Sequence, residues 1–94
     1  MTNEDLSKER LKLIVIKAVT MALDLKAKNK SVSSDDVVTY MMTNFKEIGK
    51  AKLVGIAAGS KAIDYKLHKI GTDKEIMEKV MKESGEIIDS VLSD

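Results

Sequence analysis

Apolar side chains recur every three or four residues along four stretches of the chain, which is the spacing that gathers them on one side of an α-helix. The first stretch runs from Glu4 to about Lys28. Its apolar stripe consists of Leu11, Val15, Ala18, Ala22 and Leu25. The bulky run at residues 13–16 would also suit a strand, but it is short and lies inside a much longer helical pattern. We therefore expect a long helix near residues 4–28.

The second stretch opens with local signals for a helix start. Ser33 is placed to act as an N-cap, and Asp36 stands at the third helical position, where it can complete a capping box. The apolar stripe that follows consists of Val37, Met41, Phe45 and Ile48. Gly49 then offers a left-handed residue at which a helix can stop. These signals predict a second helix near residues 33–48.

The third stretch, near residues 51–70, has two different apolar sides. One side carries large residues at alternating steps of three and four: Leu53, Ile56, Ser60, Ile63, Leu67 and Ile70. This spacing is typical of a seam that packs against a neighbouring helix, so we expect this side to be core. The opposite side is made of small residues, mainly Ala51, Gly55, Ala58 and Ala62. Two glycines in a helix interior cost about 1 kcal/mol each, which indicates a close approach by another element.

The small-residue side of the third helix leaves two alternatives open. Gly55, Ala58 and Ala62 can form a helix crossing within one chain, or they can form the interface of a homodimer. The same residues are our candidate interface residues in the second case. The sequence favours neither alternative.

The last stretch, near residues 73–92, shows the most regular amphipathic pattern of the chain. Gly71 is expected to close the third helix, and Thr72 with Glu75 forms the sequence of a capping box. The buried side would consist of Ile76, Met77, Val80, Met81, Ser84, Ile87, Ile88 and Val91. We expect a single fourth helix here.

The four predicted helices indicate an all-α protein, a small four-helix bundle in which residues 1–94 form one domain. A length of 94 residues leaves room for one hydrophobic core. The third helix should be central because it is apolar on two sides. The alternative is a small α+β domain of the winged-helix type.

A second α+β alternative comes from the segment Gly59-Ser60-Lys61-Ala62-Ile63-Asp64, which follows the apolar run from Leu53 to Ala58. Together with the helix before it, this part of the chain resembles the middle helix–strand–helix of Alba-type chromatin proteins. The resemblance implies a strand at Leu53 to Ala57. The two strands that close the domain in that family have no counterpart in the helical pattern after Thr72.

Composition narrows the class of protein further. With 44% hydrophobic and 33% charged residues, the chain is too apolar to be disordered and too charged to cross a membrane. It has no cysteine, and its first five residues are acidic rather than basic as in a signal peptide. We expect a cytoplasmic protein without membrane contact. Because so small a core is marginal, self-association is an expected source of stability.

The charge is unevenly distributed although the net charge is only +1. Residues 43–71 carry a net charge of +4, whereas residues 72–94 carry −4. The basic segment holds Lys46, Lys50, Lys52, Lys61, Lys66 and Lys69, which are our candidate nucleic-acid-binding residues. Lysines at this density can contact the phosphates of DNA or of another polyanion. Attraction between a basic and an acidic helix inside one fold explains the same asymmetry.

No residue pattern indicates catalysis, a metal or a cofactor. His68 is the only histidine, and the end of a helix is a favourable place for its charge. The acidic pairs lack the Glu-x-x-His spacing of helical di-metal sites. Gly59-Ser60-Lys61 lacks the order of glycines found in a phosphate loop. We expect a protein that is not an enzyme, with no catalytic residue and no bound metal or cofactor.

Two hypotheses about function remain. In the first, the protein binds nucleic acid in the manner of a helix-turn-helix, with residues 47–50 as the turn and mostly phosphate contacts, because the third helix lacks arginine, asparagine and glutamine for reading bases. In the second, it is a protein-interaction or self-assembling module with no role in nucleic-acid binding.

Overall fold

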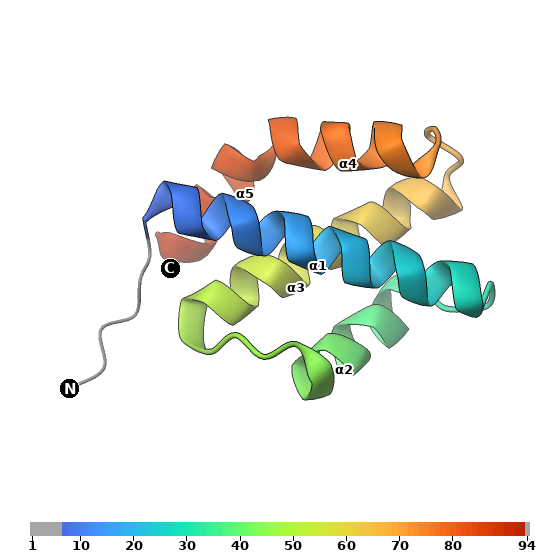
Figure 1. The fold of residues 1–94 in the computed structure, drawn as a ribbon, viewed down its shortest axis with the longest axis horizontal. Coiled ribbons are helices and arrows are strands. Elements are labelled where there is room, and N and C mark those ends of the chain that lie inside the picture. Colours follow the sequence, from blue (N-terminus) through green and yellow to red (C-terminus); the bar gives the residue numbers. More distant parts are fainter. Residues whose placement is uncertain (1–6, 94) are drawn as a thin grey trace.

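The computed structural model describes residues 7–93, which form five α-helices and contain no strand (Figure 1). The helices are α1 (Lys8–Lys28), α2 (Ser34–Asn44), α3 (Gly49–Leu67), α4 (Asp73–Lys82) and α5 (Ser84–Leu92). The all-α prediction is confirmed. The predicted count of four helices is wrong by one, and the alternative strand at Leu53 to Ala57 is wrong because these residues lie inside α3.

α3 occupies the centre of the bundle, as the sequence predicts. It packs along α1, and it also contacts α2, α4 and α5 (Figure 1). α2 lies along one side of the α1–α3 pair and α4 along the other, while α5 turns behind α1 (Figure 1). The bundle therefore leaves only one strip of α3 without a helix over it.

Capping residues fix three helix starts. The hydroxyl of Ser7 accepts from the backbone N–H of Arg10 at the start of α1; the expected start at Glu4 lies outside the described residues. Both predicted capping boxes are confirmed. Ser33 N donates to Asp36 Oδ2 at 3.0 Å, and Thr72 N donates to Glu75 Oε1 at 2.9 Å. These helix starts are set by neighbours in sequence, which is why they could be predicted.

The helix ends differ from the predictions. α2 stops at Asn44, four residues early, and Gly49, with φ of 59°, begins α3 instead of ending α2. α3 stops at Leu67, where Lys69 takes the left-handed conformation with φ of 55°. The N–H of Lys69 donates to Lys66 O, and that of Ile70 donates to Tyr65 O, which is the Schellman pattern of hydrogen bonds. The residue that closes α3 is therefore Lys69, not Gly71.

The predicted fourth helix is interrupted at Glu83 and forms α4 and α5. The hydroxyl of Ser84, which is buried, donates to Met81 O at 2.7 Å across this break. Ile76 and Val80 of α4 and Ile88 of α5 are all fully buried, and both helices contact α1 as well as α3. The bend lets the two short helices follow the core where one straight helix would leave it.

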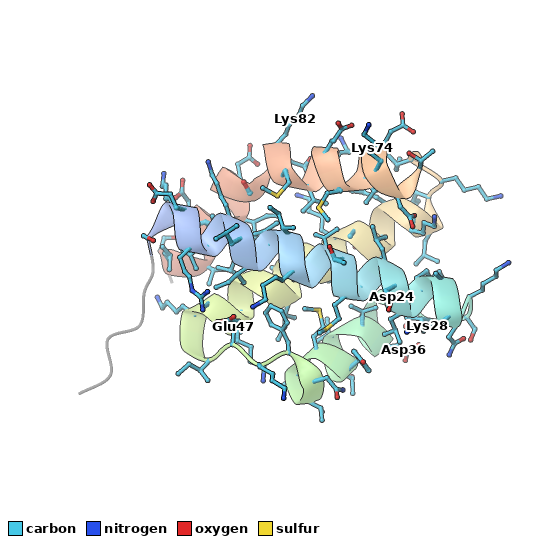
Figure 2. All side chains as sticks on the ribbon, viewed as in Figure 1. Asp24, Lys28, Asp36, Glu47, Lys74 and Lys82 are labelled. Atoms are coloured by element: carbon cyan, nitrogen blue, oxygen red, sulfur yellow. The ribbon has the colours of Figure 1, made fainter. Side chains whose placement is uncertain are left out.

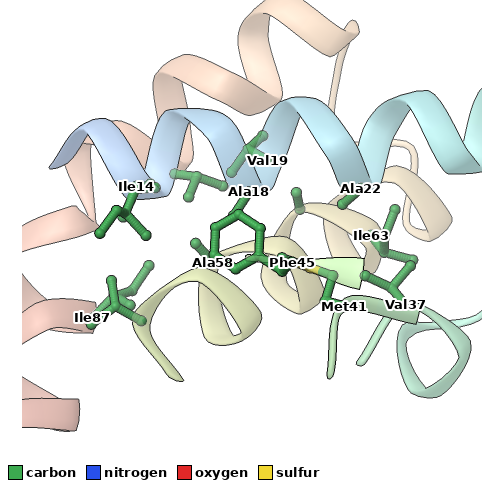
Figure 3. Close-up of a cluster of buried hydrophobic side chains, with 14 of the residues drawn as sticks. Ile14, Ala18, Val19, Ala22, Val37, Met41, Phe45, Ala58, Ile63 and Ile87 are labelled. Atoms are coloured by element: carbon green, nitrogen blue, oxygen red, sulfur yellow. The ribbon is translucent and has the colours of Figure 1, made fainter. Parts of the chain in front are cut away.

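The core lies on the small-residue side of α3, so the prediction that the large seam is core is wrong. Leu53, Leu67 and Ile70 are 53%, 48% and 51% exposed, and of the seam only Ile63 is fully buried. Ala58 and Ala62 are instead completely buried. The inner side of α3 packs against Ala18 and Ala22 of α1, with Met41 of α2 and the ring of Phe45 in the following loop beside them (Figure 3).

Close approach explains this reversal. A Cβ atom built on Gly55 would lie 2.3 Å from Cε2 of the Phe45 ring, and one on Gly59 would lie 2.7 Å from Met41 Sδ and 3.4 Å from Ala22 Cβ. Phe45 and Met41 therefore fill the space that side chains on α3 would otherwise occupy. At these two positions α2 and the loop after it supply the bulk and α3 contributes backbone, whereas Val54 and Ile63 of α3 are themselves fully buried.

Candidate interaction surface

Two of the candidate lysines on α3 bind the ends of neighbouring helices. Lys50 Nζ donates to the carbonyl of Leu92 at 3.2 Å, and Lys52 Nζ donates to the carbonyl of Met42 at 2.6 Å. Leu92 ends α5 and Met42 lies in the last turn of α2, where carbonyl groups have no partner within their own helix. These ammonium groups therefore stabilise helix ends within the chain.

The other two lysines of α3 form ion pairs with the acidic C-terminal segment. Lys61 Nζ lies 3.4 Å from Glu83 Oε1, and Lys66 pairs with Asp73 at the start of α4. The attraction between a basic middle and an acidic end, which was one reading of the charge pattern, is thus seen in these two contacts.

The side chains of Lys46 and Lys69 make no hydrogen bond or ion pair with the residues that the structure describes, and both residues are exposed. They flank α3 at its two ends, and a helix of 19 residues spans roughly 28 Å. The structure therefore does not bring the six candidate lysines together on one surface.

Residues 47–50, which the helix-turn-helix hypothesis takes as the turn, are bound to α1 through Glu47. Glu47 accepts from Arg10 Nη2 at 3.0 Å and from Lys17 Nζ at 3.1 Å (Figure 2). The helix that follows is the central one, and its one uncovered strip is mainly apolar. A recognition helix needs a polar face directed at solvent, whereas the solvent-facing strip of α3 carries Leu53, Ile56 and Leu67 beside Ser60 and Asp64.

One of the candidate lysines, Lys66, lies close to other lysine side chains. Lys66 lines a pocket of about 390 Å³ between the end of α1 and the start of α4, together with Lys26, Lys30 and Asp73. Lys26 Nζ donates to the carbonyl groups of Lys30 and Val32, which holds the loop after α1. The pocket adjoins a wider groove of about 490 Å³. That groove is lined by Thr20, Leu23, Asp24, Ala27, Asp73, Lys74, Met77 and Glu78.

The candidate interface residues lie inside the chain. Gly55, Ala58 and Ala62 all face the α1–α2 side, and each is buried. Of the two alternatives, the structure places them in a helix crossing within one chain. A second copy could not reach them without unfolding the bundle.

The side of α3 that no other helix covers is our candidate interaction surface. At 100° per residue, six side chains share this side, and none is buried. We call them the outer α3 face: Leu53, Ile56, Ala57, Ser60, Asp64 and Leu67. Leu53 and Leu67 are about half exposed, and a groove of about 350 Å³ between α3 and α5 runs along Ala57. Apolar side chains that are exposed on a central helix indicate a surface that a partner covers.

A polar network holds the break between α4 and α5 against α3. Tyr65 Oη donates to Glu83 Oε1 at 2.5 Å, and Lys79 Nζ lies 3.8 Å from Glu83 Oε2. Burial, then the hydrogen bond and charge of Glu83, raise the pKa of Tyr65 to about 12. Desolvation alone would raise the pKa of Glu83, but the Tyr65 hydrogen bond and the nearby Lys61 and Lys79 outweigh it and lower that pKa. The network is structural, since each member is bonded within the chain.

His68 and the acidic side chains of residues 7–93 form no further candidate site. His68 is exposed at the end of α3, with Nδ1 2.7 Å from the carbonyl oxygen of Asp64. Among residues 7–93, no group of three or more His, Asp or Glu side chains is arranged to hold a metal ion. Within the same residues, no helix is both long and apolar enough to cross a bilayer.

Comparison of the chain with protein-family models, with curated proteins and with solved structures yields no match. The candidate site therefore depends on the geometry alone.

Sequence reasoning placed the outer α3 face on the wrong side of the molecule. A signal was present, because Gly55 and Gly59 mark the side where another backbone comes close. The meeting of Lys66 with Lys26 and Lys30 was also missed, since it depends on how the ends of α1 and α3 pack.

Proposed function

We propose that the protein is a non-enzymatic protein-interaction module that binds through the outer α3 face. One observation carries the proposal: Leu53 and Leu67 are about half exposed on the most enclosed helix of the bundle. Exposed apolar surface is removed from water when a partner covers it, at roughly 25 cal/mol per Å². A protein partner with an apolar helix or groove suits this strip.

The lysines give less support to the first hypothesis, nucleic-acid binding along α3, which stays an untested prediction. Lys50, Lys52, Lys61 and Lys66 are engaged with carbonyl or carboxylate groups of the same chain. Contact with phosphates would first have to break these interactions. The outer face between them is mainly apolar, and its single charge is acidic.

A photo-crosslinking experiment in the producing cell tests the proposal. A benzophenone amino acid replaces Leu53 in one variant and Leu13 in a matched control, because Leu13 is 56% exposed on α1, the helix that packs against the inner side of α3. We expect discrete protein adducts from position 53 and none from position 13. Equal or absent adducts at both positions would remove the basis for the proposal.

A second candidate function is binding of a polyanion at the pocket between α1 and α4. It is favoured by the three lysines that line this pocket, of which Lys26 and Lys66 are bonded within the chain, so that Lys30 is the one expected to meet a phosphate. Fluorescence anisotropy with duplex DNA at two salt concentrations tests it, since phosphate contacts weaken steeply with salt. Lys30→Glu should abolish such binding and Lys46→Glu should not. Absence of binding at about 50 mM salt would exclude both nucleic-acid hypotheses.

A further inference from the structure

We propose that the partner at the outer α3 face is a short acidic, amphipathic segment of another protein, which binds where α3 meets the loop after α2. The inference rests on the proposed function and names the chemistry of the partner. The binding surface continues from Leu53 onto this loop and the end of α2. We call the added part the connection patch: Met42, Lys46, Ile48 and Lys52. It lies on the side of the α1–α3 pair away from α4 (Figure 1).

The connection patch extends the apolar strip of the outer α3 face. Ile48 and Met42 are the most exposed large apolar side chains among the described residues, at 65% and 61%. Lys52 joins both to Leu53, which is the next residue: its backbone N–H donates to Ile48 O at 3.2 Å, and its Nζ donates to Met42 O at 2.6 Å. Exposed apolar side chains from three segments of the chain therefore gather around one lysine.

The charge of the connection patch is positive and is not cancelled by a carboxylate of the described residues. Lys46 is exposed, and its side chain makes no hydrogen bond or ion pair there. Lys52 Nζ is held by a carbonyl group, which is neutral, so the positive charge remains. Glu47, the acid of the loop, is only 13% exposed and pairs with Arg10 and Lys17 of α1. A partner with both apolar and acidic side chains would complement this surface.

Asp64 favours a short protein segment over an anionic bilayer or a nucleic acid. It lies on the outer α3 face eleven residues beyond Leu53, which is about 16 Å along the helix. A bilayer surface or a nucleic acid would bring negative charge to Asp64 as well as to Lys46. A short segment can place its carboxylates at the lysine end alone and its apolar side chains along the rest.

The size of the apolar area also indicates a short segment. Met42, Ile48 and Leu53 together expose on the order of 300 Å², a patch size that is often functional on a monomer surface. Stable complexes of globular proteins bury about 800 Å² on each partner. The surface therefore suits a segment of about two helical turns, and the affinity should be modest and should fall with salt as the charges are screened.

Selection from a displayed library of random peptides tests the chemistry of the partner. We expect the selected peptides to be enriched in aspartate and glutamate together with large apolar residues, relative to the starting library. Fluorescence anisotropy then measures the affinity of the most frequent peptide. Lys46→Glu and Ile48→Ser should each weaken its binding at least roughly tenfold. Serine is a good N-cap residue, so Ile48→Ser keeps the start of α3.

Two matched variants control for general effects of charge and exposed apolar surface. Lys69→Glu reverses an exposed charge beyond the other end of α3, and Leu13→Ser removes a side chain that is 56% exposed on α1. Both should leave the affinity for the peptide unchanged. The same weakening in a control and in its matched variant would overturn the inference, because the connection patch would then have no specific role.

The proposed segment is also rejected if no peptide is selected, if the selected peptides are not acidic, or if they bind Lys46→Glu and Ile48→Ser as well as the parent. Binding of phosphatidylserine vesicles or duplex DNA through the patch, with no peptide binding, would reject it in favour of that partner. The photo-crosslinking at position 53 separates this failure from that of the proposed function. Protein adducts that Lys46→Glu leaves unchanged, with no peptide binding, would reject the acidic segment alone. Neither adducts nor peptide binding would reject both.

Discussion

The two sides of α3 differ in a way that hydrophobicity does not explain. The inner side consists mainly of alanine and glycine, together with Val54, and is buried, whereas the outer side carries two leucines that are about half exposed. The inner side is core because other elements come close to it: the Phe45 ring fills the space at Gly55, and a Cβ atom at Gly59 would already lie 3.4 Å from Ala22 Cβ of α1. Whether a side of α3 is buried therefore depends on how closely a neighbouring element can approach it.

Side chains on the two sides of α3 also have different roles. A side chain on the inner side determines whether the chain folds, since interiors are packed as densely as organic crystals. A side chain on the outer side has little effect on the fold and is available to a partner. Substitutions of similar size on the two sides should therefore give opposite patterns of stability and association.

The largest effect is expected from Ala58→Leu, which adds three heavy atoms to a completely buried position. We expect a loss of about 3 kcal/mol in the free energy of unfolding, the upper part of the range for overpacking. The loss should be the same at any protein concentration, because the site lies within one chain. The neighbouring substitution Ala57→Leu on the outer side is the control and should change stability by less than about 0.5 kcal/mol. Thermal melts at two concentrations measure both, and similar losses in the two variants would contradict the assignment of sides.

Gly55→Ala and Gly59→Ala form the next comparison, within the inner side. Both variants gain about 1 kcal/mol of helix propensity. At Gly55 the new methyl group would overlap the ring of Phe45, which is only 4% exposed and cannot move away. At Gly59 it meets the flexible thioether of Met41. We expect Gly55→Ala to lose about 1–2 kcal/mol net and Gly59→Ala to be nearly neutral. Urea titrations test this, and a stabilised Gly55→Ala would show that the ring has room.

The edge between the two sides is expected to respond to pH. Because the pKa of Glu83 is lowered in the fold, its carboxylate contributes stability at pH values above its ordinary pKa of 4.5, and this contribution is lost as the pH falls. Glu83→Gln should cost about 1 kcal/mol at pH 7 and progressively less as the pH falls below 4.5. Glu86→Gln, one turn along and exposed, is the control. A difference between parent and Glu83→Gln that does not shrink at all as the pH falls below 4.5 would count against an ionised acceptor for Tyr65.

The smallest effect concerns the end of α3, beyond both sides. Lys69 has φ of 55°, which a residue with a Cβ atom adopts at a cost of about 1–2 kcal/mol. Lys69→Gly removes this strain but makes the unfolded chain more flexible, so the net gain should be about 0.5–1 kcal/mol. Lys69→Ala keeps the Cβ atom and should gain nothing. Chemical unfolding measures the stability of the two variants. Equal free energies of unfolding would mean that the Schellman turn is not strained.

The sequence supported correct predictions wherever the cause is local. The capping boxes at Ser33 and Thr72 depend on residues three positions apart, and the helical periodicity is local too. The orientation of α3 is not local, because it depends on where Phe45 packs after α2 ends early. The break at Glu83 likewise depends on the core that α4 and α5 must follow.

The same reason limits what could be predicted of the site. The density of lysines in residues 43–71 is visible in the sequence, but their acceptors are remote: Lys50 binds the carbonyl of Leu92, and Lys61 pairs with Glu83. A pattern of charge along the chain says which helices can attract each other, and only the fold says which charges are already engaged.

Thiol-labelling rates test the central claim, that the outer α3 face is open to solvent and the inner side is closed. Single cysteines at positions 53, 13 and 58 are compared in the folded chain. We expect Leu53→Cys to react about as fast as Leu13→Cys, and Ala58→Cys to react slowly because labelling there requires the bundle to open. Slow labelling of Leu53→Cys would contradict the exposed face, and fast labelling of Ala58→Cys would contradict the buried inner side.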